Sequence, residues 1–444
     1  MKTNKSSKQP PAFTHEGGPS TNTDSLTRLK RVAMTCMLFE DNFYIDGKTL
    51  AESIEQICEK VDKQKIVEIS LESSQKGLLR HLPLFLIIQA LKKGAKCAEA
   101  ISIICNRPDQ MTELLSLYWR GDKKPIANQL KKGLAKAFRK FDEYQLAKYN
   151  RAEKIKLRDV LFLSHAKPKD EAQDQLWKRL IDNKLATPET WETKLSGGED
   201  KKESFSDLLQ RGKMGTLATI RNLRNMYESG VDKKLVESQL MKEGRPILPF
   251  QFLAAARECP QWEDIIDKAM IKSIERRTPL DGITIVLVDV SGSMDALLSN
   301  KSKMKRYDAA CGIAILTREI CRECEFFSFS TELSIVAPRR GMALRDAIIT
   351  SQPHGGTALG WALTKLQQSQ RKDLKIKRII VITDEQSHDI IPKMNIEYCY
   401  IINIAPYQQG IQNNGQWHTI NGFSENVIDY IEEYEKVSGV LDPA

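Results

Sequence analysis

The chain has 444 residues, which is too long for one ordinary hydrophobic core and predicts two or three domains. Its composition is 41% hydrophobic and 28% charged, with 17 prolines and 24 glycines, and this excludes a collagen-like, low-complexity or long disordered chain. The 67 basic and 58 acidic side chains give a net charge of +9. A basic balance favours an anionic partner.

Membrane and export signals are missing from the sequence pattern. The most apolar stretch, from His81 to Lys93, is far shorter than the ~18–20 residues of a membrane helix. The first 20 residues lack the apolar core of a secretory signal. We therefore expect a cytoplasmic protein with no membrane partner.

The nine cysteines are scattered at irregular spacing, which does not fit a disulfide framework. Cys321 and Cys324 form the one close pair, and no further ligands accompany them as a structural zinc site would require. The cysteines are therefore expected to be buried apolar thiols.

The chain begins with a polar segment, residues 1–24, which predicts a flexible tail. Residues 25–280 follow a helical pattern, in which Leu50, Ile54 and Ile57 recur at spacings of three and four. Short breaks such as that at 107–109 separate the helices. Although no fixed-period repeat is visible, many short helices with small breaks favour an all-α domain of stacked, HEAT-like helix pairs.

The positive charge is concentrated in this helical part. Residues 1–280 carry a net charge of +12, whereas residues 281–444 carry −3. The segment 121–169 alone has 14 basic and 5 acidic residues, a net charge of +9. Nucleic acid and membrane surfaces are the usual partners of such a segment, and a solvated helical surface is the alternative.

After residue 280 strands alternate with helices, which predicts a parallel sheet covered by helices over residues 281–444. The expected strands include Ile283–Asp289, Lys377–Thr383 and Tyr398–Ile404, and the first two end next to an aspartate. Ligands of such sheets bind beyond the carboxyl ends of the strands. This second domain is predicted to be a Rossmann-like α/β fold.

Polar residues gather at that predicted sheet edge: Asp289, Ser291 and Ser293 after one strand, Thr357 after two glycines, and Asp384 after a later strand. Hydroxyl and carboxylate oxygens are hard ligands that suit Mg²⁺, Mn²⁺ or Ca²⁺. Mg²⁺ is the favoured ion.

In order and spacing, these five residues resemble the metal-ion-dependent adhesion site of von Willebrand factor A domains. The resemblance extends over about residues 282–437 and implies that all five take part in holding the metal. A motif that is retained without metal, or that holds it only structurally, is the alternative.

The helical part contains phrases that resemble the TROVE module of the Ro autoantigen family. They lie at residues 80–84, 137–150, 156–160, 163–168, 185–191, 215–226 and 245–250. A TROVE module followed by a von Willebrand factor A domain is the architecture of that family. The chain is therefore identified as a bacterial or phage member, with a ring of helical repeats plus the α/β domain.

The resemblance implies that a small noncoding RNA of the Y type binds the outer surface of the ring. It also implies that single-stranded 3′ ends of misfolded RNA enter the hole, and that an exoribonuclease is recruited through the RNA. Family contacts carry over onto Lys148 and His165, although His165 as a helix-end cap is the alternative.

Further cations are candidates for RNA contact. Those at helical spacing form a predicted basic ridge, and two others lie on one helix face; they are Lys131, Lys132, Lys136, Arg139, Lys140, Lys167, Arg221 and Arg224. A solvated face is the alternative for the ridge. Arg221 and Arg224 either line the ring interior or pair with acids across helices.

No grouping of residues predicts an enzyme, because the sequence lacks a phosphate-binding loop and a Ser-His-Asp arrangement. Two functions follow. The first is an RNA-binding scaffold or adaptor in RNA quality control or processing. The second is a metal-dependent platform, without RNA, on which the metal site grips an acidic protein ligand.

Overall fold

The computed structural model describes residues 12–13, 19–20, 24–33, 47–75, 79–120, 124–242, 247, 249–275, 279–298, 302–369, 375–405, 410–412, 414–422 and 426–441. Most of the predicted tail, and part of the phrase at 245–250, lie outside these residues. The chain forms two compact units. One contains Ser25–Phe39 and Gly47–Gly244, and the other contains Met1–Asp24, Glu40–Asp46 and Arg245–Ala444.

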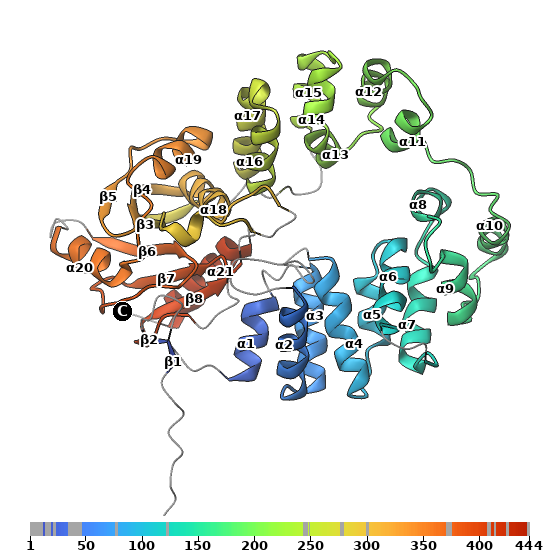
Figure 1. Cartoon of the computed structure of the whole chain (residues 1–444), viewed down its shortest axis with the longest axis horizontal. Helices are drawn as coiled ribbons and strands as arrows, with labels where there is room; N and C mark the ends of the chain where they lie inside the picture. The colour runs from blue at the N-terminus through green and yellow to red at the C-terminus, as the bar shows by residue number, and fades with distance from the viewer. Residues whose placement is uncertain are drawn as a thin grey trace, which may run out of the picture. The chain divides into compact units, whose positions relative to one another are not determined.

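The first unit, called the helical unit below, is made of helices joined by short connections (Figure 1). Its elements are α1 (Ser25–Ala33), α2 (Gly47–Glu59), α3 (Lys63–Gln75), α4 (His81–Lys92), α5 (Ala98–Ile104), α6 (Pro108–Tyr118), α7 (Asn128–Phe138), α8 (Glu143–Tyr149), α9 (Leu157–Ser164), α10 (Glu171–Ile181), α11 (Trp191–Ser196), α12 (Lys201–Gln210), α13 (Thr216–Arg221), α14 (Leu223–Glu228) and α15 (Lys233–Leu240).

Neighbouring helices of this unit pack side by side, with α3 on α4, α5 on α7 and α7 on α9 (Figure 1). The apolar residues at spacings of three and four supply the shared core, since Leu50, Ile54 and Ile57 are all buried. At Gly133 on α7, an added Cβ would lie 2.6 Å from Ile101 Cβ on α5. The two helices therefore approach more closely there than any larger residue would allow.

The second unit, called the sheet unit, alternates strands and helices. Its main elements are α16 (Pro249–Glu258), α17 (Glu263–Ile274), β3 (Leu280–Asp289), α18 (Arg306–Ile320), β4 (Cys321–Phe329), β5 (Leu333–Ile335), α19 (Gly341–Ile349), α20 (Leu359–Ser369), β6 (Ile376–Thr383), β7 (Tyr398–Asn403), β8 (Trp417–Asn421) and α21 (Asn426–Leu441). Short 3₁₀ turns lie at Pro260–Trp262 and Gly292–Asp295. Ala12–Phe13 (β1) pairs antiparallel with Pro19–Ser20 (β2).

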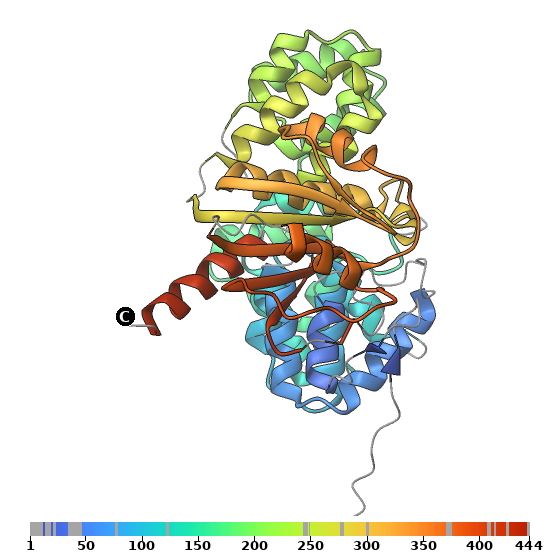
Figure 2. The ribbon, with the colours of Figure 1, turned by 90° about the vertical axis from the view of Figure 1, so that its left-hand side faces the viewer.

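The six-stranded sheet has the order β5-β4-β3-β6-β7-β8, with β5 antiparallel and the other strands parallel. Figure 2 shows its strands lying side by side, in yellow to red. Alternate residues of the central strands face opposite layers. Leu287 and Val381 pack with Leu363 of α20 in one core, whereas α18 packs against β3, β4 and β6.

The sheet unit begins well before the change of pattern that the sequence shows near residue 280. α16 and α17 pack on α18 and α19, which assigns them to the sheet rather than to the helical repeats. A Cβ on Gly312 of α18 would lie 3.2 Å from the backbone nitrogen of Phe250. Met342 N–H donates to Asp267 Oδ1 at 2.8 Å, which fixes α19 to α17.

The expected strands are present with small changes of boundary, but β8 was missed, as were the two-residue strands β1 and β2 in the predicted tail. β8 is a short edge strand with only Trp417 buried, so its sequence lacks the apolar alternation that reveals other strands. No described helix is long and apolar enough to cross a membrane.

Candidate functional site

The carboxyl edge of the sheet collects the polar residues that the sequence placed at strand ends. β3 ends at Asp289, and β6 ends at Thr383, immediately before Asp384. The strands are parallel neighbours with Val288 opposite Ile382, so both carboxylates emerge at the same edge. Both aspartates are fully buried.

Hydrogen bonds hold the loop after β3 against Asp289. Ser291 N–H donates to Asp289 Oδ1 at 2.9 Å, and the Thr383 hydroxyl donates to Asp289 Oδ2 at 2.6 Å. The Oγ atoms of Ser291 and Ser293 are 3.2 Å apart. Two of the predicted hydroxyl ligands therefore lie together beside one of the predicted carboxylates.

The glycine loop that carries Thr357 is tied to the same edge through its backbone. Gly292 N–H donates to the carbonyl of Gly355 at 2.8 Å. The carbonyl of Thr357 accepts from the Ser387 hydroxyl at 3.1 Å, in the loop that follows Asp384. The three loops of the predicted metal site therefore meet.

A buried arginine that the sequence reasoning missed lies within this group. Arg306, the first residue of α18, is 1% exposed. Its Nη1 donates to Asp384 Oδ2 at 3.1 Å and to the carbonyl of Ser293 at 3.3 Å. The guanidinium thus compensates one of the two buried carboxylates, which would otherwise be costly to bury.

Electrostatics at the edge favour a further cation. Burial, together with the nearby charge of Asp384, raises the pKa of Asp289 to about 7, although hydrogen bonds from Ser291 and Thr383 oppose this. A dication would relieve this penalty. The donor set of carboxylate and hydroxyl oxygens fits Mg²⁺, Mn²⁺ or Ca²⁺ better than zinc.

The cysteines in the described part of the chain do not form a competing site. Eight of them are unbonded thiols, and no group of three or more His, Cys, Asp or Glu side chains in those residues could hold a metal. Burial raises the pKa of Cys321 to about 11 and that of Cys105 to about 12. Such thiols are unreactive.

The predicted RNA-contacting cations lie on the helical unit. Lys131, Lys132 and Lys136 are on α7, Arg139 and Lys140 follow it, Lys148 is on α8, His165 and Lys167 follow α9, and Arg221 and Arg224 are on α13 and α14. All are exposed except Lys131 and Lys148, which are half-buried.

Arg139, which follows α7, contacts the segment after α9 that carries His165 and Lys167. Arg139 Nε donates to the carbonyl of Lys167 at 2.7 Å. His165, two residues earlier, is the exposed C-cap of α9 and has left-handed backbone angles, φ 53° and ψ 37°. A non-glycine residue in that region carries about 1–3 kcal/mol of strain, which is often found at functional positions.

Other predicted cations are engaged in structural contacts. Lys140 Nζ donates to the carbonyl of Cys105 at 3.0 Å, so it closes the C-terminal end of α5. Burial lowers the pKa of Lys140. Lys136 pairs with Glu99, and Arg224 lies 3.8 Å from Glu228. These last two pairs are exposed and therefore weak, so their cations can change partner.

Two exposed aromatic residues beside these cations were also missed. Tyr144 is 48% exposed on α8, and Lys148 Nζ lies 5.9 Å from its ring centroid. Phe162 is 56% exposed on α9, one turn before His165. Exposed rings beside cations can stack on unpaired bases. The sequence did offer a signal for the first of them, because Tyr144 lies four positions before Lys148 in a basic segment.

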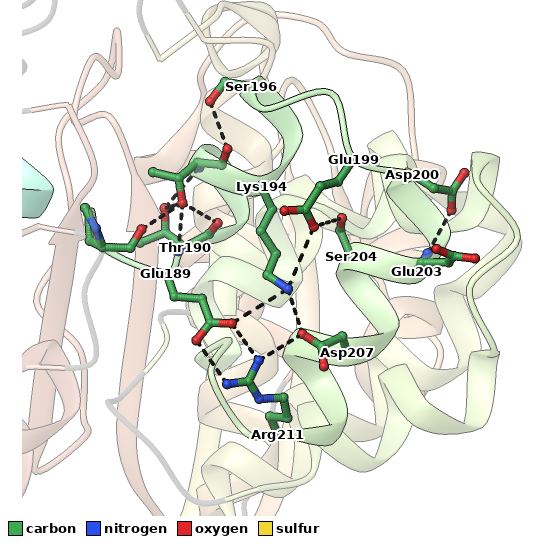
Figure 3. Close-up of polar contacts among 12 residues, drawn as sticks. Glu189, Thr190, Lys194, Ser196, Glu199, Asp200, Glu203, Ser204, Asp207 and Arg211 are labelled. Atoms are coloured by element: carbon green, nitrogen blue, oxygen red, sulfur yellow. Dashed lines mark hydrogen bonds and ion pairs between the residues drawn. The ribbon is translucent and has the colours of Figure 1, made fainter. Parts of the chain in front are cut away.

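A separate charged network joins α11 to α12 (Figure 3). Lys194 Nζ lies 2.7 Å from Asp207, 3.7 Å from Glu189 and 3.9 Å from Glu199, and Arg211 donates to Glu189 at 2.6 Å. The pocket beside it, about 310 Å³, is lined by Lys194, Glu199, Asp200, Glu203, Ser204 and Asp207. Because Lys194 and Arg211 pair with an acid of α12 and with acids of the segments beside the two helices, we interpret it as a connection between helices.

Comparisons with known proteins match part of the chain. A family model described as "TROVE domain" matches residues 178–263, which include the phrases at 185–191 and 215–226. Telomerase protein component 1 of Mus musculus is 28% identical over 146 residues, which cover 31% of this chain and 5% of that protein. The Rattus norvegicus protein of that name is 28% identical over 130 residues, covering 28% and 4%. This chain spans about one twentieth of the length of these relatives.

One solved structure shares the fold of most of the chain. It is described as the crystal structure of Deinococcus radiodurans RO (RSR) protein, with a TM-score of 0.56 and 15% identity. The match covers 91% of this chain and 98% of that chain. The predicted fold class, helical repeats plus an α/β domain, is confirmed.

Proposed function

We propose that the chain is an RNA-binding protein of the Ro type and that it binds RNA through the basic surface of α7, α8 and α9, which the TROVE match at residues 178–263 supports. The observation that carries this proposal is the contact of Arg139 with the backbone of Lys167, two residues after the strained, exposed His165. The surrounding segment 121–169 has a net charge of +9. Such cations neutralise phosphates and give affinity with little sequence preference.

The RNA that we propose is a small, structured noncoding RNA of the Y type, held on the outside of the helical repeats. We propose that single-stranded 3′ ends of misfolded RNA enter a ring formed by these repeats. The protein then acts in the cytoplasm as a scaffold or adaptor that presents RNA to an exoribonuclease and performs no chemistry itself. The TROVE match and the family phrases support this assignment.

A mobility-shift titration with a hairpin RNA that carries a single-stranded 3′ tail tests the RNA proposal. Between 50 and 200 mM salt, affinity should fall by about 10³-fold if six or more phosphates are neutralised. The double change Lys148→Ala/His165→Ala should weaken binding by about tenfold or more and reduce the salt slope, because each contact contributes.

The matched control is Lys201→Ala/Lys202→Ala, which removes two exposed cations from α12, outside the proposed surface. This control should change affinity by less than about twofold, since isolated surface charges contribute little. Absent or salt-insensitive binding would contradict RNA binding. Equal losses in both double variants would contradict the location of the surface.

We also propose that the sheet edge holds one divalent cation, with Mg²⁺ favoured over Mn²⁺ and Ca²⁺. The oxygens that would hold it belong to Asp289, Ser291, Ser293, Thr357 and Asp384. When bound, the cation supplies a positive centre to which an anionic group of a partner can attach. Arg306 orients Asp384, and the backbone of Ser291 orients Asp289.

The second candidate function, a metal-dependent platform for an acidic protein partner, is favoured by Arg306. With a dication bound, the site carries three positive charges, two from the metal and one from Arg306, which contacts Asp384. These exceed the two negative charges of Asp289 and Asp384. The loaded site therefore attracts an anion. If the RNA titration fails and Mg²⁺ binds, this candidate becomes the main function.

A further inference from the structure

We propose that the surface formed by Trp361, Lys365 and Ile390 docks a peptide segment of a protein partner. This segment presents one acidic side chain to the metal site and one aromatic or aliphatic side chain to Trp361 and Ile390. The inference rests on the metal site proposed above, and it adds the surface that selects the partner. We call these three residues the apolar rim.

Hydrogen bonds place the apolar rim directly beside the metal loops. α20 begins at Leu359, two residues after Thr357. Asp389 Oδ1 accepts from Gly360 N–H at 2.8 Å, and its Oδ2 accepts from Trp361 N–H at 2.7 Å. Asp389 also accepts from the Ser387 hydroxyl at 2.6 Å, in the loop that follows Asp384.

A glycine lets this loop lie against the helix. A Cβ on Gly360 would fall 2.1 Å from the carbonyl oxygen of Ile390, a distance that no side chain could tolerate. Ile390 therefore rests on the first turn of α20, next to Trp361. The backbone segments that carry these two apolar residues therefore lie against each other.

Both side chains are exposed where burial would be the rule. Trp361 is 42% exposed and Ile390 is 70% exposed, although residues 384–387 of the same loop are fully buried. Adjacent exposed apolar residues mark interaction sites more often than single ones do. Tryptophan is also among the residues that contribute most to protein interfaces.

The charges around the rim select an acidic segment. Asp384 is paired with Arg306, and Asp389 is engaged by two backbone N–H groups and a hydroxyl. The exposed polar neighbours are His388 and Lys365, whose Nζ lies 5.8 Å from the ring of Trp361. Of the acids on this loop, Asp384 and Glu385 are buried, and the half-buried Asp389 has both carboxylate oxygens engaged by hydrogen bonds.

The observations favour a protein over an RNA at this surface. An RNA strand gains most of its affinity from many phosphate contacts, whereas the apolar rim offers a single cation, Lys365. Ile390 offers an aliphatic contact and no ring on which a base could stack. An acidic, apolar peptide matches both the loaded metal site and the rim.

A library of random dodecapeptides displayed on phage, selected on the full chain in the presence of Mg²⁺, tests the inference. We expect enrichment of sequences with one Asp or Glu close to Trp, Phe, Leu or Ile. The enriched peptide, synthesised with a fluorophore, should bind at least tenfold more weakly to Trp361→Ala/Ile390→Ser. Replacing its acid by the amide should weaken it similarly.

The control is Ile335→Ser, which removes an 81% exposed aliphatic side chain from β5 of the same sheet unit. It should leave peptide affinity unchanged. Mg²⁺ affinity, measured by calorimetry without peptide, should be the same in the rim variant and the wild-type chain. This measurement separates failure of the rim from failure of the metal site.

Three outcomes would overturn the inference. The first is that the library yields no acidic and apolar sequence although Mg²⁺ binds. The second is that the enriched peptide binds the rim variant as tightly as the wild type. The third is that an oligouridine strand, and not the peptide, binds in a manner that depends on Trp361 and Ile390.

Discussion

The sheet edge and the basic surface both depend on charged residues, but they place them in opposite environments. Asp289, Asp384 and Arg306 are at most 1% exposed, whereas Arg139 and His165 are exposed to solvent. Burial fixes the partner of each charge and makes each one cost several kcal/mol if it is left alone. Exposed cations are screened and contribute through their number. A single substitution at the sheet edge should therefore change stability or metal affinity strongly, whereas several substitutions together are needed on the basic surface to change RNA affinity.

The largest expected effect is that of Arg306→Gln. This change leaves the Asp384 carboxylate buried without its guanidinium partner, and should lower the free energy of unfolding by about 3–5 kcal/mol. Mg²⁺ should restore part of this loss because it replaces the missing positive charge. Urea unfolding with and without Mg²⁺ measures both effects.

Lys303→Ala is the matched control, since it removes an 81% exposed lysine that pairs with Glu258. Its effect should stay below about 0.5 kcal/mol. If Arg306→Gln costs less than about 1 kcal/mol, the contrast between the two environments is wrong.

Asp289→Asn should abolish Mg²⁺ binding in calorimetry, a loss of about 100-fold or more, or ~2.7 kcal/mol. RNA affinity should remain within about twofold, because the basic surface belongs to the other unit. Asp295→Asn is the control, since this aspartate is 51% exposed and pairs with Lys305. Loss of RNA affinity in a folded Asp289→Asn chain would show that the two regions are coupled.

Without metal, pH should act on the sheet edge through Asp289. Its folded pKa is raised from 3.8 to about 7, so the folded state binds the proton more tightly than the unfolded state. The resulting contribution to stability is present at low pH and declines as pH rises through this window. Mg²⁺ competes with the proton, so its affinity should rise about tenfold per pH unit up to pH 7 and then level off.

This pH dependence is checked by calorimetry at several pH values. Urea unfolding of the metal-free chain over the same pH range measures how the free energy of unfolding depends on pH. The Asp289→Asn chain should lack the decline in stability. A wild-type profile that is flat between about pH 5 and 7 would contradict the raised pKa.

The smallest expected effect concerns His165. His165→Gly relieves about 1–2 kcal/mol of left-handed strain and loses about 0.5–1 kcal/mol to unfolded-state entropy, so stability should rise by about 0.5 kcal/mol. RNA affinity should nevertheless fall by about threefold to tenfold, because the imidazole is lost. Asn183→Gly, which also replaces a residue with positive φ (54°), should leave RNA affinity unchanged. An unchanged affinity in His165→Gly would assign the histidine to helix capping alone.

The contrast between the regions also explains what the sequence could predict. Asp289 and Asp384 follow apolar runs of strand length, and parallel strands bring such positions to one edge, so their meeting could be predicted. Arg306 could not, because 78 residues separate it from Asp384 and it ends a run of surface-like cations. Its burial depends on where α18 packs against the sheet.

On the basic surface the sequence predicts total charge but not the use of each cation. Lys140 lies in the same run as Lys132 and Lys136, yet its ammonium serves the carbonyls at the end of α5. Exposed Tyr144 and Phe162 resemble core residues in a helical pattern, and only the packing shows that they face solvent. Periodicity places a residue on a helix face, and the neighbouring helices decide whether that face is covered.

The packing of α16 and α17 on the sheet unit has a consequence for how the protein can be divided. The TROVE match ends at residue 263, the first residue of α17, whereas the boundary between the two compact units lies at residue 245. A C-terminal fragment cut at residue 281 would lose Phe250 and Asp267, and with them the contacts to Gly312 and Met342. A fragment that is to keep the packing of α18 and α19 therefore has to begin before α16.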